Sequence, residues 1–205
     1  MPRRPDLPPL ERSALAADPF DQFADWYRQA EAEAPLPDAV CLATVDSAGA
    51  PDARMVLAKG FGRDGFRFHT NYESAKAGQL DANPHAALVF YWRELDRQVR
   101  VRGEVVKLPG EESDRYFGTR PRESQIGAWA SPQSRPLQDR AELDSRVDGV
   151  TRRFGGAKVP RPEDWGGYLL RPDVIEFWQG QVGRLHDRFR YSREGEGWRI
   201  ERLAP

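Results

Sequence analysis

The spacing of hydrophobic residues changes near residue 38, from a helical period to the alternation of β-strands. Before that point, apolar residues recur every three or four positions, at Phe20, Phe23, Tyr27, Ala30 and Ala34. Asp18-Pro19 supplies a capping residue followed by a first-turn proline, and Pro35 and Pro37 are poor helix formers. The pattern therefore predicts a helix that begins at Pro19 and ends before Pro35.

After residue 38, short apolar runs separated by turn sequences predict a β-sheet. Strands are expected over residues 39–45, 53–61, 66–70, 86–92, 97–107, 167–171, 174–179, 187–192 and 198–203. The run 97–107 alternates most clearly, with Gln98, Arg100 and Arg102 opposite Val99 and Val101. Helices are expected over 74–82, 110–118 and 139–154, and the segment between the last two reads as a loop. Many short strands with a few helices predict a mainly β, α+β protein with a barrel-like sheet.

Length and charge limit the classes of protein that this chain can represent. Its 205 residues fit one domain, expected over residues 18–205, and prolines among charges predict a flexible N-terminal arm over residues 1–17. The 31 basic and 32 acidic residues nearly balance, which argues against nucleic-acid or membrane binding by the whole chain. No run is long and apolar enough to span a bilayer. Cys41, the single cysteine, is expected to be buried and fits a reducing cytoplasm.

Near the C-terminus, aromatic, guanidinium and imidazole groups lie close together in the chain. Phe177-Trp178-Gln179-Gly180 is followed by Arg184-Leu185-His186-Asp187-Arg188 and later by Arg202. A solvated tail would not carry adjacent Phe and Trp, and a plain core strand would not carry so many charges. The mixture suits a pocket for a flat anionic molecule, because aromatic rings give shape and guanidinium groups bind phosphate or carboxylate.

Three other segments combine cations with hydroxyl groups, and each has a functional and a purely structural interpretation. Arg54 and Lys59 lie five residues apart on a predicted strand, hence on opposite faces, and either bind two anions or are solvated charges. The segment 70–76 joins a strand to a helix start, where backbone amides bind phosphate or where Asn and Ser cap the helix. The segment 116–129 either converges on a phosphate or forms an exposed helix end. No spacing resembles a metal site, a P-loop or a dinucleotide fingerprint.

Taken together, these segments resemble the pyridoxamine 5'-phosphate oxidase family from about residue 18 to residue 205. The runs that carry the resemblance are residues 54–59, 97–99, 124–131, 133–134, 165–167, 177–180 and 184–188. The resemblance implies a split β-barrel that binds FMN and works as a homodimer, with each flavin held between two subunits. It also implies oxidation of pyridoxamine 5'-phosphate and pyridoxine 5'-phosphate to pyridoxal 5'-phosphate by O2, with release of H2O2.

The resemblance further implies roles for individual residues. The FMN-binding residues would be Arg54, Met55, Val56, Leu57, His69, Thr70, Lys76, Gln98, Gln133, Ser134, Trp178 and Arg188. The substrate phosphate would be bound by Lys59, Tyr116, Arg120 and Ser124, whereas Arg184 and His186 would act at the pyridine ring and its reacting carbon. Two positions depart from the family pattern, because Ala75 stands where the family usually has Arg and His69 where it usually has Tyr.

Other readings of the same residues stay open. A related FMN oxidase, such as one of a phenazine pathway, would share the flavin site but would need no grip on a substrate phosphate. A non-catalytic protein that binds flavin or pyridoxal phosphate is supported only by Ala75 and His69. A deazaflavin-dependent reductase would not be expected to carry the Arg-Leu-His sequence at residues 184–186.

Overall fold

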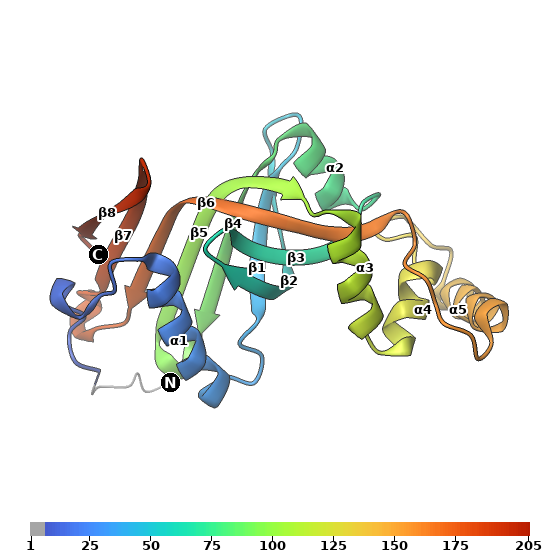
Figure 1. The fold of residues 1–205 in the computed structure, drawn as a ribbon, viewed down its shortest axis with the longest axis horizontal. Coiled ribbons are helices and arrows are strands. Elements are labelled where there is room, and N and C mark those ends of the chain that lie inside the picture. Colours follow the sequence, from blue (N-terminus) through green and yellow to red (C-terminus); the bar gives the residue numbers. More distant parts are fainter. Residues whose placement is uncertain (1–6) are drawn as a thin grey trace.

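The computed structural model describes residues 7–205 and contains a closed antiparallel barrel (Figure 1). The barrel strands are β1 (Ala39–Val45), β2 (Pro51–Gly62), β3 (Gly65–Asn71), β4 (His85–Trp92), β5 (Arg97–Lys107) and β6 (Trp165–Gln179). They pair in the order β3-β2-β1-β4-β5-β6, and a further β3–β6 pairing closes the barrel. Strands β7 (Asp187–Glu194) and β8 (Gly197–Leu203) continue the sheet beyond β6. The predicted mainly β, α+β barrel is confirmed.

The hydrophobic core fills the barrel and continues under the first helix. Helix α1 (Pro19–Glu33) begins where the sequence predicts, with the Asp18 carboxylate accepting a hydrogen bond from the Phe20 amide at 2.8 Å. Phe23 on its apolar face is fully buried, and its ring lies 4.9 Å from Phe66 of β3 and 5.0 Å from Phe90 of β4. These edge-to-face contacts attach the helix to the barrel.

Four further helices lie outside the barrel: α2 (Ala75–Ala82), α3 (Gly110–Thr119), α4 (Arg122–Ala130) and α5 (Arg140–Phe154). Helices α4 and α5 lie at the opposite end of the molecule from β7 and β8 (Figure 1). Helix α4 occupies a segment predicted as loop. It forms because Phe117, Ile126, Val159 and Trp165 pack into a small second core that draws on four separate segments.

Strand β6 was predicted as two strands, 167–171 and 174–179, but it is continuous. The sequence Arg171-Pro172-Asp173 reads as a turn, yet a register shift opposite Arg102 and Gly103 in β5 absorbs the irregularity. A Cβ atom at Gly103 would lie only 1.9 Å from the Arg171 carbonyl oxygen, so the close approach requires glycine there. The uninterrupted β6 joins the barrel to the C-terminal hairpin.

Two further expectations need correction. Cys41 is half-buried rather than buried, because the alternation of β1 turns Val40 and Leu42 inward and Cys41 outward. Residues 7–17, expected to belong to a flexible arm, pack onto the protein through buried Leu10 and Leu15; residues 1–6 of that arm lie outside the described residues. Within residues 7–205, no helix combines the length and the apolar character needed to cross a membrane.

Candidate active site

A cavity of about 600 Å³ opens beside β2, between α2 and the turn that joins α3 to α4. Strand β2 pairs with β3 only from Ala58 onward, so its preceding residues border the cavity with a free edge. Arg54 lies on this free edge, and Lys59 lies in the irregular part of the pairing between Ala58 and Phe61; both line the cavity, although they start from opposite faces of the strand. The predicted site residues that line the cavity are Arg54, Met55, Val56, Leu57, Lys59, His69, Thr70, Lys76, Tyr116, Arg120, Ser124 and Gln133.

At one end of the cavity, Lys76 is buried in the first turn of α2. Its ammonium donates to the Gln133 amide oxygen at 2.7 Å and to the Thr70 hydroxyl at 3.1 Å, both of which are neutral acceptors. Burial lowers the pKa of Lys76 from its ordinary 10.5 to about 8, with the nearby Arg54 charge adding to the effect. An anion bound here would relieve the cost of burying this charge.

Arg54 is held in place by several acceptors from neighbouring elements. Its guanidinium donates to the Thr44 hydroxyl at 2.5 Å, to the Gln79 amide oxygen at 2.9 Å and to the Asp52 carboxylate at 2.5 Å. These contacts link β1, β2 and α2 around one cation. Arg54 and Lys76 therefore present two ordered positive charges at the same end of the cavity.

Across the cavity, aromatic rings and one guanidinium form a stack. The His69 ring lies 4.0 Å from Tyr116 and 5.4 Å from Trp165, with interplanar angles of 26° and 15°. The Arg120 guanidinium lies over the Trp165 ring at 4.6 Å, and its buried Nη1 has no hydrogen-bond partner in the described part of the chain. Burial lowers the pKa of Arg120. The stack fixes Tyr116 and leaves a desolvated cation that favours an anionic ligand.

His69 is expected to make the protein less stable in acid. Burial lowers the pKa of its imidazole to about 4, below the 6.5 of an exposed histidine. Between these values the unfolded chain binds more protons than the folded one, so the contribution of His69 to stability decreases as pH falls from 6.5 to 4. Replacing His69 with Phe retains a stacking ring without a titratable group. Denaturant titrations at pH 7 and pH 5 should show a smaller loss for His69→Phe, and an equal loss would contradict the assignment.

Two other predicted residues complete this part of the cavity wall. Lys59 forms an ion pair with Asp38, which precedes β1. Ser124 lies in the first turn of α4, where its hydroxyl adds a neutral donor beside Arg120. Thr119, Pro121 and Trp165 also line the cavity, and the sequence did not predict them as site residues. The run Trp165-Gly166-Gly167 is one of those that carry the family resemblance. Nothing near it in the sequence indicates that Trp165 stacks on His69.

A second group of predicted residues lies outside the cavity, on the C-terminal part of the sheet. Gln98 of β5 pairs with Trp178 of β6, which in turn pairs with Arg188 of β7, so the three side chains form one row across the strands. The buried Glu176 carboxylate accepts a hydrogen bond from Arg188 Nε at 2.9 Å and forms an ion pair with its Nη2 at 2.8 Å, which orients the guanidinium. His186 extends the row, with its ring 4.6 Å from that of Trp178.

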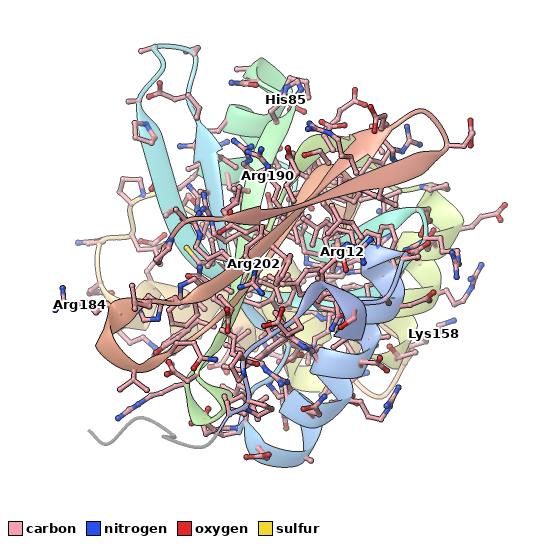
Figure 2. The ribbon with its side chains drawn as sticks, turned by 90° about the vertical axis from the view of Figure 1, so that its left-hand side faces the viewer. Arg12, His85, Lys158, Arg184, Arg190 and Arg202 are labelled. Carbon is pink, nitrogen blue, oxygen red and sulfur yellow. The ribbon has the colours of Figure 1, made fainter. Side chains whose placement is uncertain are left out.

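Arg184 and His186 lie in the loop between β6 and β7. Arg184 ends the short 3-10 helix η3 (Val182–Arg184) and adopts a positive φ of 65°, which is uncommon for a residue with a side chain. Figure 2 shows Arg184 extending from the edge of the molecule. The remaining predicted residue, Ser134, is exposed beside Gln133 and does not line the cavity. The structure thus divides the predicted site between two surfaces of the chain.

Two family models match the chain, one over each of two successive regions. A family model described as pyridoxamine 5'-phosphate oxidase matches residues 28–153, and one described as the pyridoxine 5'-phosphate oxidase C-terminal dimerisation region matches residues 165–205. The chain belongs to the pyridoxamine 5'-phosphate oxidase family. The first of these regions holds every predicted site residue that lines the cavity, and the second holds the β6–β7 loop together with Trp165 of the cavity wall.

Several relatives of this family cover nearly the whole chain. The pyridoxine/pyridoxamine 5'-phosphate oxidase of Salinibacter ruber is 52% identical over 200 residues, covering 96% of this chain and 93% of its own length. The enzyme of the same name from Rubrobacter xylanophilus is 54% identical over 197 residues, covering 96% of this chain and 91% of its own. The crystal structure of PhzG from Burkholderia lata, in complex with tetrahydrophenazine-1-carboxylic acid, superposes with a TM-score of 0.91 at 30% identity and covers 98% and 99% of the two chains.

Proposed function

We propose that this protein oxidises pyridoxamine 5'-phosphate and pyridoxine 5'-phosphate to pyridoxal 5'-phosphate, with O2 as electron acceptor and H2O2 as the second product. The observation that carries the proposal is the arrangement of cations in one cavity. Arg54 and Lys76 lie at one end, and Lys59 and Arg120 belong to the part that holds Tyr116 and Ser124. Two anion-binding groups suit one phosphate of a flavin nucleotide and one of a phosphorylated substrate.

Assembly as a homodimer is part of the proposal, because one chain does not bring the whole site together. Four of the predicted site residues do not line the cavity: Trp178, Arg184, His186 and Arg188. Strands β7 and β8, which follow the loop that carries Arg184 and His186, lie at the far end of the molecule from α4. Apolar side chains are exposed on both surfaces: Met55 and Leu57 at the cavity, Val182 and Leu185 beside Arg184. Contact between two copies would cover both pairs and complete each cavity with a partner's loop.

The residues of the cavity fit FMN at its phosphate end. Lys76 is a buried cation whose acceptors, the Thr70 hydroxyl and the Gln133 amide oxygen, are both neutral, so a phosphate would supply the negative charge that these partners lack. FMN would supply the hydride acceptor of the reaction. Arg54 and residues 55–57 would bind its phosphate and side chain, and Gln98, Trp178 and Arg188 of the second copy would close the flavin site. Ser134, exposed in one chain, and His69 belong to the same proposed set.

The geometry of His186 defines the proton that it can offer. Its Nδ1 accepts a hydrogen bond from the Gln181 backbone amide at 3.1 Å, so the proton of the neutral ring is on Nε2. Nε2 can then donate to an oxygen or nitrogen of a substrate placed over the ring of Trp178. Arg184 would contact the substrate from the same loop and fix its orientation, so that the reacting carbon lies close to the hydride acceptor.

The main alternative is a flavin oxidase of the phenazine type, since PhzG shares the fold over nearly the whole chain. The substrate end of the cavity favours the phosphorylated vitamers. Arg120 keeps a desolvated Nη1 without a partner in the described residues, and Tyr116 is fixed beside it by the ring of His69. A cytoplasmic location belongs to the same proposal and is supported only by the unpaired Cys41.

Anaerobic mixing tests the proposed reaction directly. The purified protein, loaded with FMN, is mixed with pyridoxamine 5'-phosphate in the absence of O2 while the flavin absorbance is followed. We expect the yellow colour to bleach and H2O2 to appear when air is admitted. Unphosphorylated pyridoxamine at equal concentration should bleach the flavin far more slowly. A flavin that stays oxidised with both compounds would contradict the proposal, and equal rates with both would favour the phenazine-type alternative.

Ala75→Arg is expected to tighten FMN binding. Ala75 is exposed at the first position of α2, directly before Lys76, so a longer side chain has room to reach the phosphate end of the cavity. A charged hydrogen bond is worth about 1.5–3 kcal/mol, which corresponds to roughly 10-fold to 100-fold in the FMN dissociation constant. Fluorescence titration of the FMN-free protein measures the change. Equal or weaker binding would show that another group already fills this role.

A further inference from the structure

The Asp187 carboxylate connects three segments that are far apart in the sequence. Asp187 is the first residue of β7 and stands between two proposed site residues, His186 and Arg188. Its side chain is buried and faces away from Arg188, as strand alternation requires. It accepts hydrogen bonds from the Leu10 amide at 2.9 Å, the Gln181 side-chain amide at 2.9 Å and Arg202 Nη1 at 2.7 Å.

On one side of Asp187, the N-terminal segment (residues 8–16) is fixed to the C-terminal hairpin. Arg202 of β8 donates to the Leu10 carbonyl oxygen at 2.7 Å, so both backbone groups of Leu10 are bound, one by Asp187 and one by Arg202. Gln179 donates to the Pro8 carbonyl oxygen at 2.9 Å, and Tyr191 donates to that of Ala16 at 2.8 Å. In Figure 2, Arg202 is labelled on the hairpin side of this contact region.

On the other side, Asp187 holds the loop that carries Arg184 and His186. Gln181 bridges the loop, because its side chain donates to Asp187 while its backbone amide donates to His186 Nδ1. Gly183 and Arg184, which lie between Gln181 and His186, have positive φ angles of 67° and 65°. A loop with two such residues needs fixed ends to keep one conformation. The contacts of Gln181 and Asp187 provide one of those ends.

We infer that Asp187 is a positioning residue, through which the N-terminal segment and β8 fix the loop that presents Arg184 and His186 to the substrate. The inference rests on the proposed function, in which these two side chains act on the vitamer. Asp187 acts through Gln181 and the orientation of His186 and does not itself contact the substrate. A change at Leu10, more than 170 residues away along the chain, would therefore change catalysis.

Asp187→Asn tests the inference while keeping the size of the side chain. Asparagine has one acceptor oxygen and adds a donor, so it cannot satisfy Leu10, Gln181 and Arg202 together. A reacting group displaced by about 1 Å lowers the rate by roughly 100-fold, and we expect a decrease of about 10-fold to 100-fold in the anaerobic flavin-reduction rate. The FMN dissociation constant and the dimer content should stay within about 2-fold of wild type.

Two further variants separate positioning from general damage to the fold. Leu10→Pro removes the amide donor to Asp187 and also replaces the buried leucine side chain. Leu10→Ala keeps the donor while removing the side chain, so the difference between the two variants reports on the backbone contact. Leu10→Pro should lower the reduction rate more than Leu10→Ala, and it should add little in the Asp187→Asn background, because both act through one contact. Glu201→Gln is the matched control, since it breaks ion pairs with Arg190 and Arg199 in the same hairpin.

The outcomes distinguish this inference from the proposed function. If Asp187→Asn reduces its flavin as fast as Glu201→Gln, the inference is wrong. It is equally wrong if Asp187→Asn loses FMN or dissociates while keeping its turnover per bound flavin, because Asp187 would then serve assembly. If wild type itself fails to reduce its flavin with pyridoxamine 5'-phosphate, the proposed function fails instead.

Discussion

Mixing two impaired variants, Arg184→Ala and Arg120→Ala, is expected to restore activity. In the proposed homodimer, each variant alone lacks one group at both sites, and we expect Arg184→Ala to lower turnover by about 100-fold while retaining FMN. In a mixed dimer whose sites are shared, one site carries both substitutions and the other carries neither. Random reassociation makes half of the dimers mixed, so about a quarter of wild-type turnover should return.

The control for this experiment is a second mixture, Arg184→Ala with His186→Ala. Both residues belong to the same loop, so every site of a mixed dimer still lacks one of them and no activity should return. Differently tagged subunits confirm that mixed dimers have formed. A mixture of Arg184→Ala and Arg120→Ala that forms such dimers and stays inactive would exclude a shared site. Loss of flavin from Arg184→Ala with unchanged turnover per bound flavin would instead place Arg184 in the cofactor site.

The elements that the sequence predicted well are those whose pattern is local. Strand β5 has the predicted bounds of residues 97 and 107, because valines facing the core alternate with polar residues facing outward. Helix α1 starts at its predicted cap because its capping group is also local: the Asp18 side chain accepts a hydrogen bond from the Phe20 amide. Helix α4 was missed because its stability comes from Val159 and Trp165, which are distant in sequence. The division of β6 was wrong because the strand continues past Pro172 by leaving Asp173 unpaired, opposite Arg102 and Gly103 of β5.

The same distinction applies to the candidate site. Short motifs identified residues that gather in the cavity, among them Arg54, Lys76 and Arg120, since each motif keeps its cation beside hydroxyl or backbone donors. Some of the partners that orient these cations come from other segments and left no local signal, such as Gln79 for Arg54 and Gln133 for Lys76. His69, a departure from the family pattern, is stacked on Tyr116, and Asp187 is bound to Leu10 at the other end of the chain. Neither contact can be inferred from spacing alone.

The affinity for FMN is expected to decrease at alkaline pH because of Lys76. In the FMN-free protein, burial lowers the pKa of this ammonium to about 8. A phosphate dianion beside it would favour the protonated form, so binding above that pH requires uptake of a proton. The dissociation constant of FMN should change little between about pH 7 and pH 8, where the phosphate is a dianion, and should rise by about tenfold per pH unit above pH 8. Fluorescence titrations between pH 7 and about pH 10 measure this dependence.

Stability of the FMN-free protein should change in the opposite direction, which makes the assignment specific. Between the folded pKa of about 8 and the ordinary value of 10.5, the unfolded chain binds more protons at Lys76 than the folded chain. The contribution of Lys76 to the free energy of unfolding therefore rises with pH across this window, while FMN affinity falls. Lys76→Met should abolish both dependences and weaken FMN binding at pH 7 by roughly 10-fold to 100-fold. If Lys76→Met keeps the alkaline loss of affinity, the titrating group is not Lys76, and the phosphate site must be placed elsewhere in the cavity.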